Sequence, residues 1–470
     1  MKRILSFAFS FLSLSVLGQT NISPGTMKLI QDAIHKDYEL ANSQLEINKT
    51  DQDIKKAHET YVPKVNATAA YAYLDNKLTI DLPAIQIPGL NLPLPQGDQT
   101  FHNTSSLGLA ALNTQMVLFS GMQVTYGSKA LNEKKKAQQH LSDAKRLDIA
   151  EDVINTIDQI ALLQQSKVLL DESRVRLDKE VLRVNRAIEN GLATPYERKK
   201  IEVALNQLAS RQEEYEGKKA LLYSKLEMLT AHPMSELEQL VVSLKPWLLN
   251  AAAEEDIKPR SEILALEAGE HAADYQIKMQ KAKVLPQVVG MASFGYVNLF
   301  NNTIRTPFAN PLNGQDIAIK SDNLKLYPNW IAGIGLKWDI FSGFSRTREL
   351  NKLYMDKTIA ENRRKDISEK LDLLREKSRT EYRTAIKQMS LKSAEKVLAE
   401  STLDLAVKSY QQGLLPVSER LAAETGMQQA QLEYLQSIYN QRKAAIQYLK
   451  ASGNFSLQQN SNNSDENERY

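Results

Sequence analysis

The stretch FSGMQVTYGSKALNEKKK, residues 119–136, opens the segment that decides the fold, and FSGFSRTRELNKLYMDK, residues 341–357, opens a second one. After each Phe-Ser-Gly a proline-free run predicts one very long helix, over residues 122–188 and 346–411. At 1.5 Å per residue each helix would be roughly 100 Å long. A compact domain has no room for such helices, so we expect them to project as a rod or tube.

The chain contains an internal duplication. Phe-Ser-Gly recurs after 341 − 119 = 222 residues, and three further landmarks keep this offset within one residue. These are Gly191-Leu192 with Gly413-Leu414, Glu197-Arg198 with Glu419-Arg420, and Pro63 and Val65 with Pro286 and Val288. The offset predicts two repeats, residues 19–230 and 259–453, each with the order helix, strand, strand, long helix, helix. An inter-repeat segment, 231–258, lies between them, and the polar tail 454–470 is expected to be disordered.

The N-terminal segment and the composition limit the kind of protein that this chain can be. Lys2 and Arg3 followed by an apolar run over residues 4–17 predict a secretory signal peptide, residues 1–18. The absence of cysteine excludes disulfides, thiolate metal sites and a lipidated N-terminal cysteine. The net charge is only +3, and no basic block stands apart from acidic neighbours, so nucleic acid is not the expected partner.

The helix that comes after each Gly-Leu turn has apolar residues at coiled-coil spacing, in steps of four and three. Such a stripe is typical of ordinary helix packing. In the first repeat Gln212 and Lys219 interrupt it, and in the second Arg442 does. Its members are Ile201, Leu205, Leu208, Tyr215, Leu222, Leu226 and Leu229, then Leu432, Leu435, Tyr439, Ile446 and Leu449.

Four short segments are predicted as membrane-facing strands, because apolar and polar residues alternate along most of them. From Trp330 to Phe341, apolar residues on one face alternate with Gly333, Gly335, Lys337 and Asp339 on the other. Segments after Pro63 and Pro286 alternate similarly, whereas residues 106–118 do so poorly. An aromatic membrane girdle is expected from Tyr71, Tyr73, Phe294, Tyr296, Trp330 and Trp338.

The connections between these strands are predicted as extended exterior loops, residues 76–104 and 301–329, because they are rich in proline. The apolar stretch 82–90 has no assigned role. Since four strands cannot enclose water, several chains must share one wall.

The duplicated order, the Phe-Ser-Gly turns and the Gly-Leu turns together resemble the TolC and OprM family of outer-membrane efflux proteins, over about residues 24–453. The resemblance implies an α+β membrane protein: a homotrimer with a long α-helical coiled-coil tunnel in the periplasm and a shared 12-stranded transmembrane β-barrel. It implies an exit duct through the outer-membrane lipid for tripartite efflux or type I secretion. The implied partners are a periplasmic adaptor (membrane fusion protein) and an inner-membrane pump, and the cargo stays open.

The family's functional positions map onto both turns. Adaptor contact falls on Gly191, Leu192 and Thr194 and on Gly413 and Leu414, although glycine there also serves as a helix C-cap. An acidic periplasmic gate falls on Glu419 and Glu197, with Tyr410 as its linking tyrosine. A second acidic position falls on Ala422 and the linking arginine on Leu415, and a Glu near a helix N-terminus also compensates the helix dipole.

Two other classes of protein are alternatives to an export duct. An enzyme is not expected, because the six histidines have no metal-ligand spacing and no nucleotide or nucleophile motif occurs. No cofactor or metal is therefore expected. A soluble periplasmic coiled-coil scaffold or adaptor is the stronger alternative, because it would share the signal peptide and the long helices.

Overall fold

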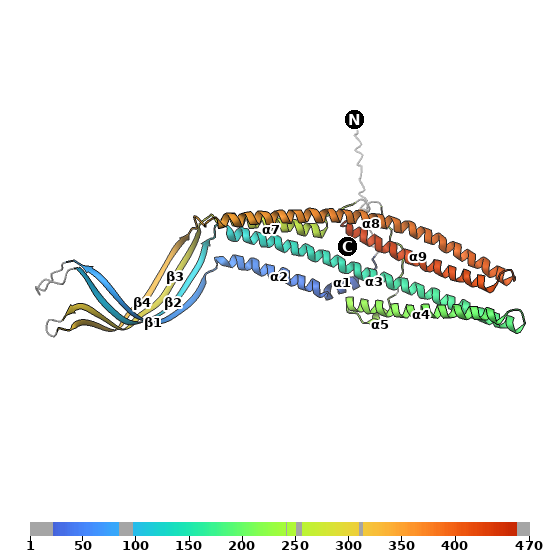
Figure 1. Cartoon of the computed structure of the whole chain (residues 1–470), viewed down its shortest axis with the longest axis horizontal. Coiled ribbons are helices and arrows are strands. Elements are labelled where there is room, and N and C mark those ends of the chain that lie inside the picture. Colours follow the sequence, from blue (N-terminus) through green and yellow to red (C-terminus); the bar gives the residue numbers. More distant parts are fainter. Residues whose placement is uncertain (1–21, 84–96, 241, 251–255, 310–313, 458–470) are drawn as a thin grey trace, which may run out of the picture. The chain divides into compact units, whose positions relative to one another are not determined.

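The computed structural model describes residues 22–83, 97–240, 242–250, 256–309 and 314–457 (Figure 1). The expected signal peptide, most of the apolar stretch 82–90 and tail residues 458–470 lie outside the described residues. Two compact units are present. Unit 1 comprises Met1–Lys49, Lys135–Gly269 and Ile359–Tyr470, and unit 2 comprises Thr50–Lys134 and Glu270–Thr358. Each unit contains corresponding parts of both repeats.

The two long helices are confirmed. Helix α3 spans Gln123–Glu189 and helix α8 spans Ser345–Gln411, 67 residues each. Both follow a left-handed turn at the Phe-Ser-Gly sequence, where Gly121 has φ 62° and Gly343 has φ 61°. Only glycine adopts this conformation without steric cost, so the turn separates strand from helix at the same place in both repeats.

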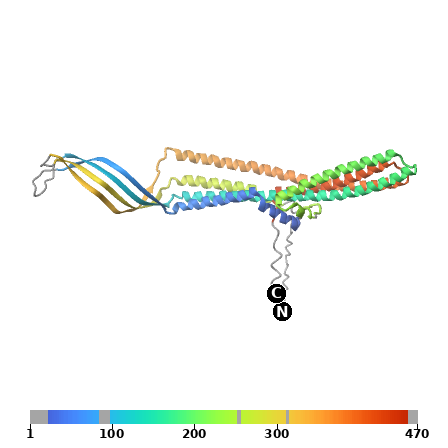
Figure 2. The ribbon, with the colours of Figure 1, turned by 90° about the horizontal axis from the view of Figure 1, so that it is seen from below.

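Unit 1 is helical, and its helices run side by side in both ribbon views (Figures 1 and 2). It contains α1 (Pro24–Lys36), α4 (Pro195–Thr230), α5 (Met234–Leu237) and α9 (Val417–Ala451), with much of α3 and α8. Helices α2 (Tyr38–His58) and α7 (Ser261–Ala282) contribute one end each. Its main core is apolar, with Ile30, Ile154, Leu226 and Ile446 among the residues withdrawn from solvent.

The inter-repeat segment packs against α8 and α9. The Gln441 side chain accepts a hydrogen bond from the Trp247 backbone N–H (2.8 Å) and donates one to the Trp247 carbonyl (2.7 Å). The Tyr382 hydroxyl accepts from the Leu249 N–H at 2.8 Å. Side chains thus satisfy the backbone of a segment that lacks regular structure here.

Arg442, which interrupts the apolar stripe, forms a buried ion pair. Its Nε lies 2.7 Å from Asp158 Oδ2 on α3, and its Nη1 donates to the Lys245 carbonyl at 2.9 Å. Burial raises the pKa of Asp158, and the Arg442 guanidinium opposes part of that rise. The interruption is therefore a polar link between α9, α3 and the inter-repeat segment.

Unit 2 contains a four-stranded antiparallel sheet in the order β1-β2-β3-β4. The strands are β1 (Lys64–Leu82), β2 (Gly97–Phe119), β3 (Gln287–Ala309) and β4 (Asp316–Lys337). They lie side by side in chain order (Figure 1). Pairing of β2 with β3 joins the two repeats.

The predicted loops 76–104 and 301–329 were wrong in extent, because the strands continue through much of both. Pro307 and Pro328 lie within β3 and β4, where the β3–β4 register shifts between Arg305 and Ala309 and between Gly295 and Val297. Since proline lacks a backbone N–H, it is tolerated in a strand at such irregularities. The predicted strand end was also wrong, because β4 stops at Lys337 and the left-handed turn around Gly343 follows.

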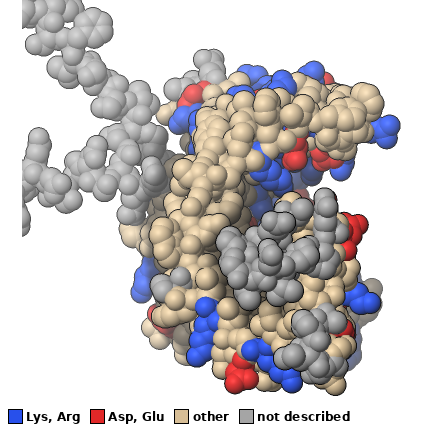
Figure 3. All heavy atoms as spheres, turned by 90° about the vertical axis from the view of Figure 1, so that its left-hand side faces the viewer, with Lys and Arg blue, Asp and Glu red and all other residues tan. Residues whose placement is uncertain are grey.

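Among the described helices, none contains an apolar run that would let it span a membrane. Seen from the side of the strands, most of the visible surface is uncharged (Figure 3).

Candidate functional site

The turns after α3 and α8 end both helices in the same way. Gly191 and Gly413 are left-handed, with φ of 71° and 76°. The Leu192 N–H bonds to the Ala187 carbonyl (2.8 Å), and the Leu414 N–H to the Ser409 carbonyl (2.9 Å). Each glycine N–H also bonds to the carbonyl three residues earlier, that of Ile188 or Tyr410, at 3.0 Å. Together with the six-to-one hydrogen bond from the leucine, this is the Schellman motif that caps helix C-termini. Helix capping therefore accounts for the glycines.

Capping does not account for the leucines. In a Schellman motif the residue after the glycine often packs back on the helix. Here the side chains of Leu192 and Leu414 are 82% and 75% exposed. Thr194, the N-cap residue of α4, is also exposed and makes no side-chain capping bond. Each turn thus presents an apolar side chain to its surroundings.

The predicted gate residues are only partly brought together. Tyr410 packs against the core at this end of unit 1, and burial followed by the charge of Glu180 raises its pKa to about 12. Glu197 in the first turn of α4 contributes to the same rise. Glu419 in the first turn of α9 is exposed and, within the described part of the chain, forms no ion pair.

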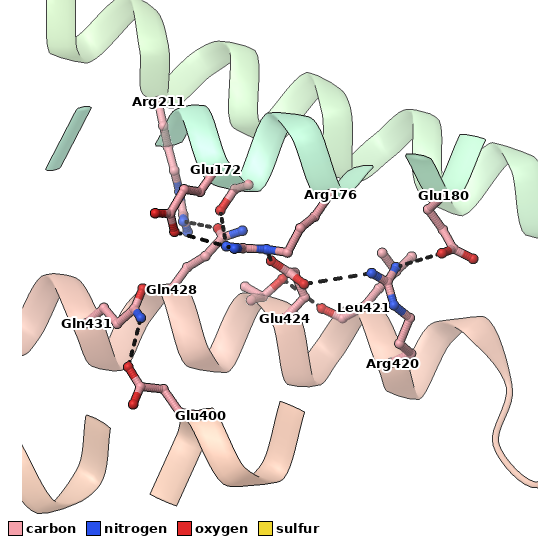
Figure 4. Close-up of polar contacts among 12 residues, drawn as sticks. Glu172, Arg176, Glu180, Arg211, Glu400, Arg420, Leu421, Glu424, Gln428 and Gln431 are labelled. Carbon is pink, nitrogen blue, oxygen red and sulfur yellow. Dashed lines mark hydrogen bonds and ion pairs between the residues drawn. The ribbon is translucent and has the colours of Figure 1, made fainter. Parts of the chain in front are cut away.

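A buried charged cluster that the sequence analysis missed lies beside this core, between α3 and α9 (Figure 4). Arg176 Nε donates to Glu424 Oε1 at 2.5 Å. Arg420 lies 3.4 Å from Glu180 Oε2 and 3.8 Å from Glu424 Oε2. The side chains of Glu424, Arg420 and Glu180 are 2%, 6% and 3% exposed. We call these four residues the α3–α9 cluster.

Two further contacts flank the α3–α9 cluster. Arg176 also lies 3.5 Å from Glu172, one turn earlier on α3, whose carboxylate is mostly exposed. Arg211 of α4 lies 3.4 Å from the amide oxygen of Gln428 on α9. The first repeat is thereby linked to the second through charge at a helix interface that is otherwise apolar.

The α3–α9 cluster is not fully satisfied. Glu180 Oε1, Glu424 Oε2 and the Nε and Nη1 of Arg420 are buried without a hydrogen bond. Buried charges with incomplete hydrogen bonding depend on their ion-pair partners and become costly when a partner leaves. The cluster therefore favours the helix arrangement in which all four charges are close together.

A signal for this cluster was present in the sequence. Counting from Val417 in steps of four and three reaches Leu421, Glu424 and Gln428, so two polar residues occupy seam positions of α9. Glu180 follows Ser173 by seven residues and is likewise buried. The spacing identifies the polar positions, but not their partners on a helix more than 200 residues away.

The predicted girdle residues lie in unit 2. Phe294 and Trp330 are register partners, and Tyr327, which the sequence analysis missed, makes edge-on ring contacts with Phe294 and Tyr296. Tyr71, Tyr73 and Trp330 are 73%, 68% and 71% exposed. Because the strands are longer than expected, these residues lie well inside them and not at their ends. Trp338 follows β4 and donates from its indole to the Val284 carbonyl at 2.9 Å.

Comparison with known families places the chain. The sequence pattern of the outer membrane efflux protein family matches residues 29–231 and 254–454, which cover most of both repeats. The chain belongs to this family. No protein of curated function matches it.

Several solved structures share the fold of this outer membrane efflux protein. A membrane protein from Pseudomonas aeruginosa is 16% identical with a TM-score of 0.69, covering 94% of this chain and 92% of its own. The CmeC outer membrane channel of Campylobacter jejuni is 13% identical with a TM-score of 0.67, covering 98% and 95%. The outer membrane protein VceC from Vibrio cholerae is 16% identical with a TM-score of 0.66, covering 91% and 96%. The predicted fold class and family are confirmed.

Removing one charge from the α3–α9 cluster should destabilise unit 1. We expect Glu424→Gln to lower the free energy of unfolding by about 3–5 kcal/mol, because Arg176 and Arg420 lose their shared carboxylate. Glu172→Gln removes the exposed carboxylate that pairs with the same Arg176 and should cost at most about 1 kcal/mol. Denaturant unfolding of the purified variants measures both, and equal losses would contradict a special role for the buried cluster.

The raised pKa of Tyr410 should be visible in alkaline solution. Its phenol is neutral below pH 10 in folded and unfolded chains alike, so this contribution to stability is fully present there. As the pH rises from 10 to about 12 the unfolded chain loses its proton first, and the contribution is lost. Tyrosinate absorbance of wild type minus Tyr410→Phe should give the high pKa, and Glu180→Gln should lower it. Titration of Tyr410 at the ordinary tyrosine value would contradict this account.

Proposed function

We propose that the chain is the outer-membrane exit duct of a tripartite efflux or type I secretion system. It is a passive channel through which inner-membrane partners drive small molecules or proteins. The sheet lies in the outer membrane and the helices form a tunnel in the periplasm. The proposal includes no catalytic step. Membership of the outer membrane efflux protein family supports it.

The observation that carries the proposal is the sheet of unit 2. Its two outermost strands, β1 and β4, are 19 and 22 residues long, and each has a partner on one side only among the described residues. Long open edges are avoided in soluble proteins because they template aggregation. Three copies joined β4 to β1 would close a 12-stranded barrel and leave no edge.

The exposed side chains of the sheet agree with lipid on one face. Ile334, Leu336 and Val65 are more than half exposed, as are Trp330 and Tyr71. Such apolar surface is expensive in water and favourable in a bilayer. A soluble periplasmic scaffold, the alternative, would have no use for it.

The two exposed leucines support contact with an adaptor at the turns. We assign Gly191 and Gly413 to shaping the turns, and Leu192, Leu414 and the exposed Thr194 to the contact itself. An adaptor (membrane fusion protein) would bury these side chains at little conformational cost, since the turns are already fixed by their backbone hydrogen bonds.

We assign Glu419 to an acidic constriction at the same end of unit 1 and not to a packing role. It is exposed and unpaired in the described chain, so its charge is available to the water in the duct. Threefold repetition would place three such carboxylates around one axis. Tyr410, which packs against the core, and the half-buried Glu197 then position the turns.

The duct proposal is tested on the full-length protein. We expect extraction only with detergent, migration as a trimer, and ion conductance in planar bilayers. In the same bilayers Glu419→Ala should reduce cation selectivity and block by divalent cations. A monomer released with the soluble periplasm would overturn the duct, whereas a conducting trimer whose selectivity ignores Glu419→Ala would remove only the gate.

The turn proposal is tested in the native host by efflux or secretion. We expect Leu192→Ser combined with Leu414→Ser to abolish transport while trimer yield and thermal unfolding stay unchanged, because neither side chain is packed. Leu221→Ser is the matched control, since Leu221 is 73% exposed on α4 away from the turns. Normal transport by the double variant, or equal loss in the control, would contradict adaptor contact through these leucines.

A further inference from the structure

A polar cleft lies in unit 2 where α7 leads into β3 and β4 leads into α8. Its volume is 490 Å³, and its lining includes three cationic side chains, Lys283, Lys337 and Arg346, and two carboxylates, Asp339 and Glu349. The difference, three minus two, leaves one net positive charge. The remaining lining is mostly uncharged and polar, including Gln287 and Ser345.

None of the three cations is neutralised by an ion pair within the described residues, and one of them, Arg346, is held by a hydrogen bond. Arg346 Nη2 donates to the Asp339 backbone carbonyl at 2.6 Å, and this contact consumes no charge. The Trp338 indole bonds to the Val284 carbonyl, which ties the segment carrying Lys283 to the end of β4. Across the described ranges, the ammonium groups of Lys283 and Lys337 have no hydrogen-bond or ion-pair partner. Unpaired cationic donors that line one cleft are an arrangement that binds anions.

Arg346 is placed against the local electrostatic rule. The first turn of α8 contains no acidic residue, and Arg346 and Arg348 stand there near the positive end of the helix dipole. Helices α2, α4, α7 and α9 each have a glutamate in the first turn, namely Glu39, Glu197, Glu262 and Glu419, whereas α1, α3 and α8 have no acidic residue there. The Arg346 side chain is held there by its hydrogen bond to the Asp339 carbonyl, and its charge has no ion-pair partner among the described residues.

The duplication provides an internal comparison. At the offset of 222 residues, Lys337, Arg346 and Glu349 correspond to Gln115, Val124 and Gly127, all uncharged. The first-repeat junction is also tied together internally, since the Tyr61 hydroxyl and Ser120 Oγ are 2.8 Å apart. The fold therefore does not need charges at these positions of the junction, and only the second repeat has them.

The position of Lys337 indicates which surface the cleft serves. Along β4 the exposed Ile334 and Leu336 alternate with Gly335 and Lys337, so Lys337 lies on the face opposite the apolar one. In the proposed duct that opposite face meets water and the transported solute. We propose that the cleft is a binding site for anionic groups of solutes in transit, of the phosphate or carboxylate class. This inference rests on the proposed duct function.

Isothermal titration of inorganic phosphate into the full-length trimer tests the site without requiring transport. We expect saturable binding that Lys337→Gln with Arg346→Gln weakens about tenfold or more. Glu349→Gln should strengthen it, because a carboxylate that repels the anion is removed. Opposite effects of two substitutions in one cleft cannot come from a general folding defect.

The matched control is Arg348→Gln with Lys352→Gln, which also removes two positive charges, here from positions on α8 outside the cleft. We expect it to leave phosphate binding unchanged. Absence of binding to wild type, or equal weakening by the control, would overturn the site. In planar bilayers phosphate should reduce the current of wild type more than that of the cleft variant. A protein that binds phosphate but does not conduct would sink the duct and keep the anion site.

Discussion

Unpaired backbone along β1 and β4 is the constraint on which the other features of this protein depend. Each strand has N–H and C=O groups on its outer side that the described chain does not satisfy, and an exposed apolar face lies between the two edges. Water could hydrate the edges but not the face, and lipid could cover the face but not the edges. Shared pairing between identical subunits resolves both conditions, and it makes the proposed pore a property of the assembly.

The helical unit solves a different problem. Helix α3 of the first repeat and helix α9 of the second must stay in register, and apolar seams are tolerant of sliding. The ion pairs Arg176 with Glu424, Arg420 with Glu180, and Arg442 with Asp158 fix that register, because buried charges are satisfied at one alignment only. Polar residues in a seam reduce stability relative to apolar ones but specify the alignment. Such ion pairs would also limit the number of alternative helix arrangements that unit 1 can adopt.

The two repeats have kept their backbone and diverged in their side chains. Both retain the left-handed Phe-Ser-Gly turn and the Schellman turn, since these depend on glycine conformation. They differ in two places. The junction cleft of the second repeat is charged, and the seam of α9 contains polar residues that pair with α3. A channel wall built from two similar halves can therefore carry different chemistry on each.

Local signals were enough for the long helices and their ends. Freedom from proline over 67 residues and a glycine at each boundary act through neighbouring residues, so α3 and α8 were predicted within one residue or so. The strands were underestimated because Pro307 and Pro328 indicated loops, and only the sheet shows that register shifts accommodate them. The α3–α9 cluster and the junction cleft join residues far apart in the chain, and no spacing rule identifies such partners. Their pairing depends on how the helices and strands pack, and that packing is set by the burial of many side chains at once.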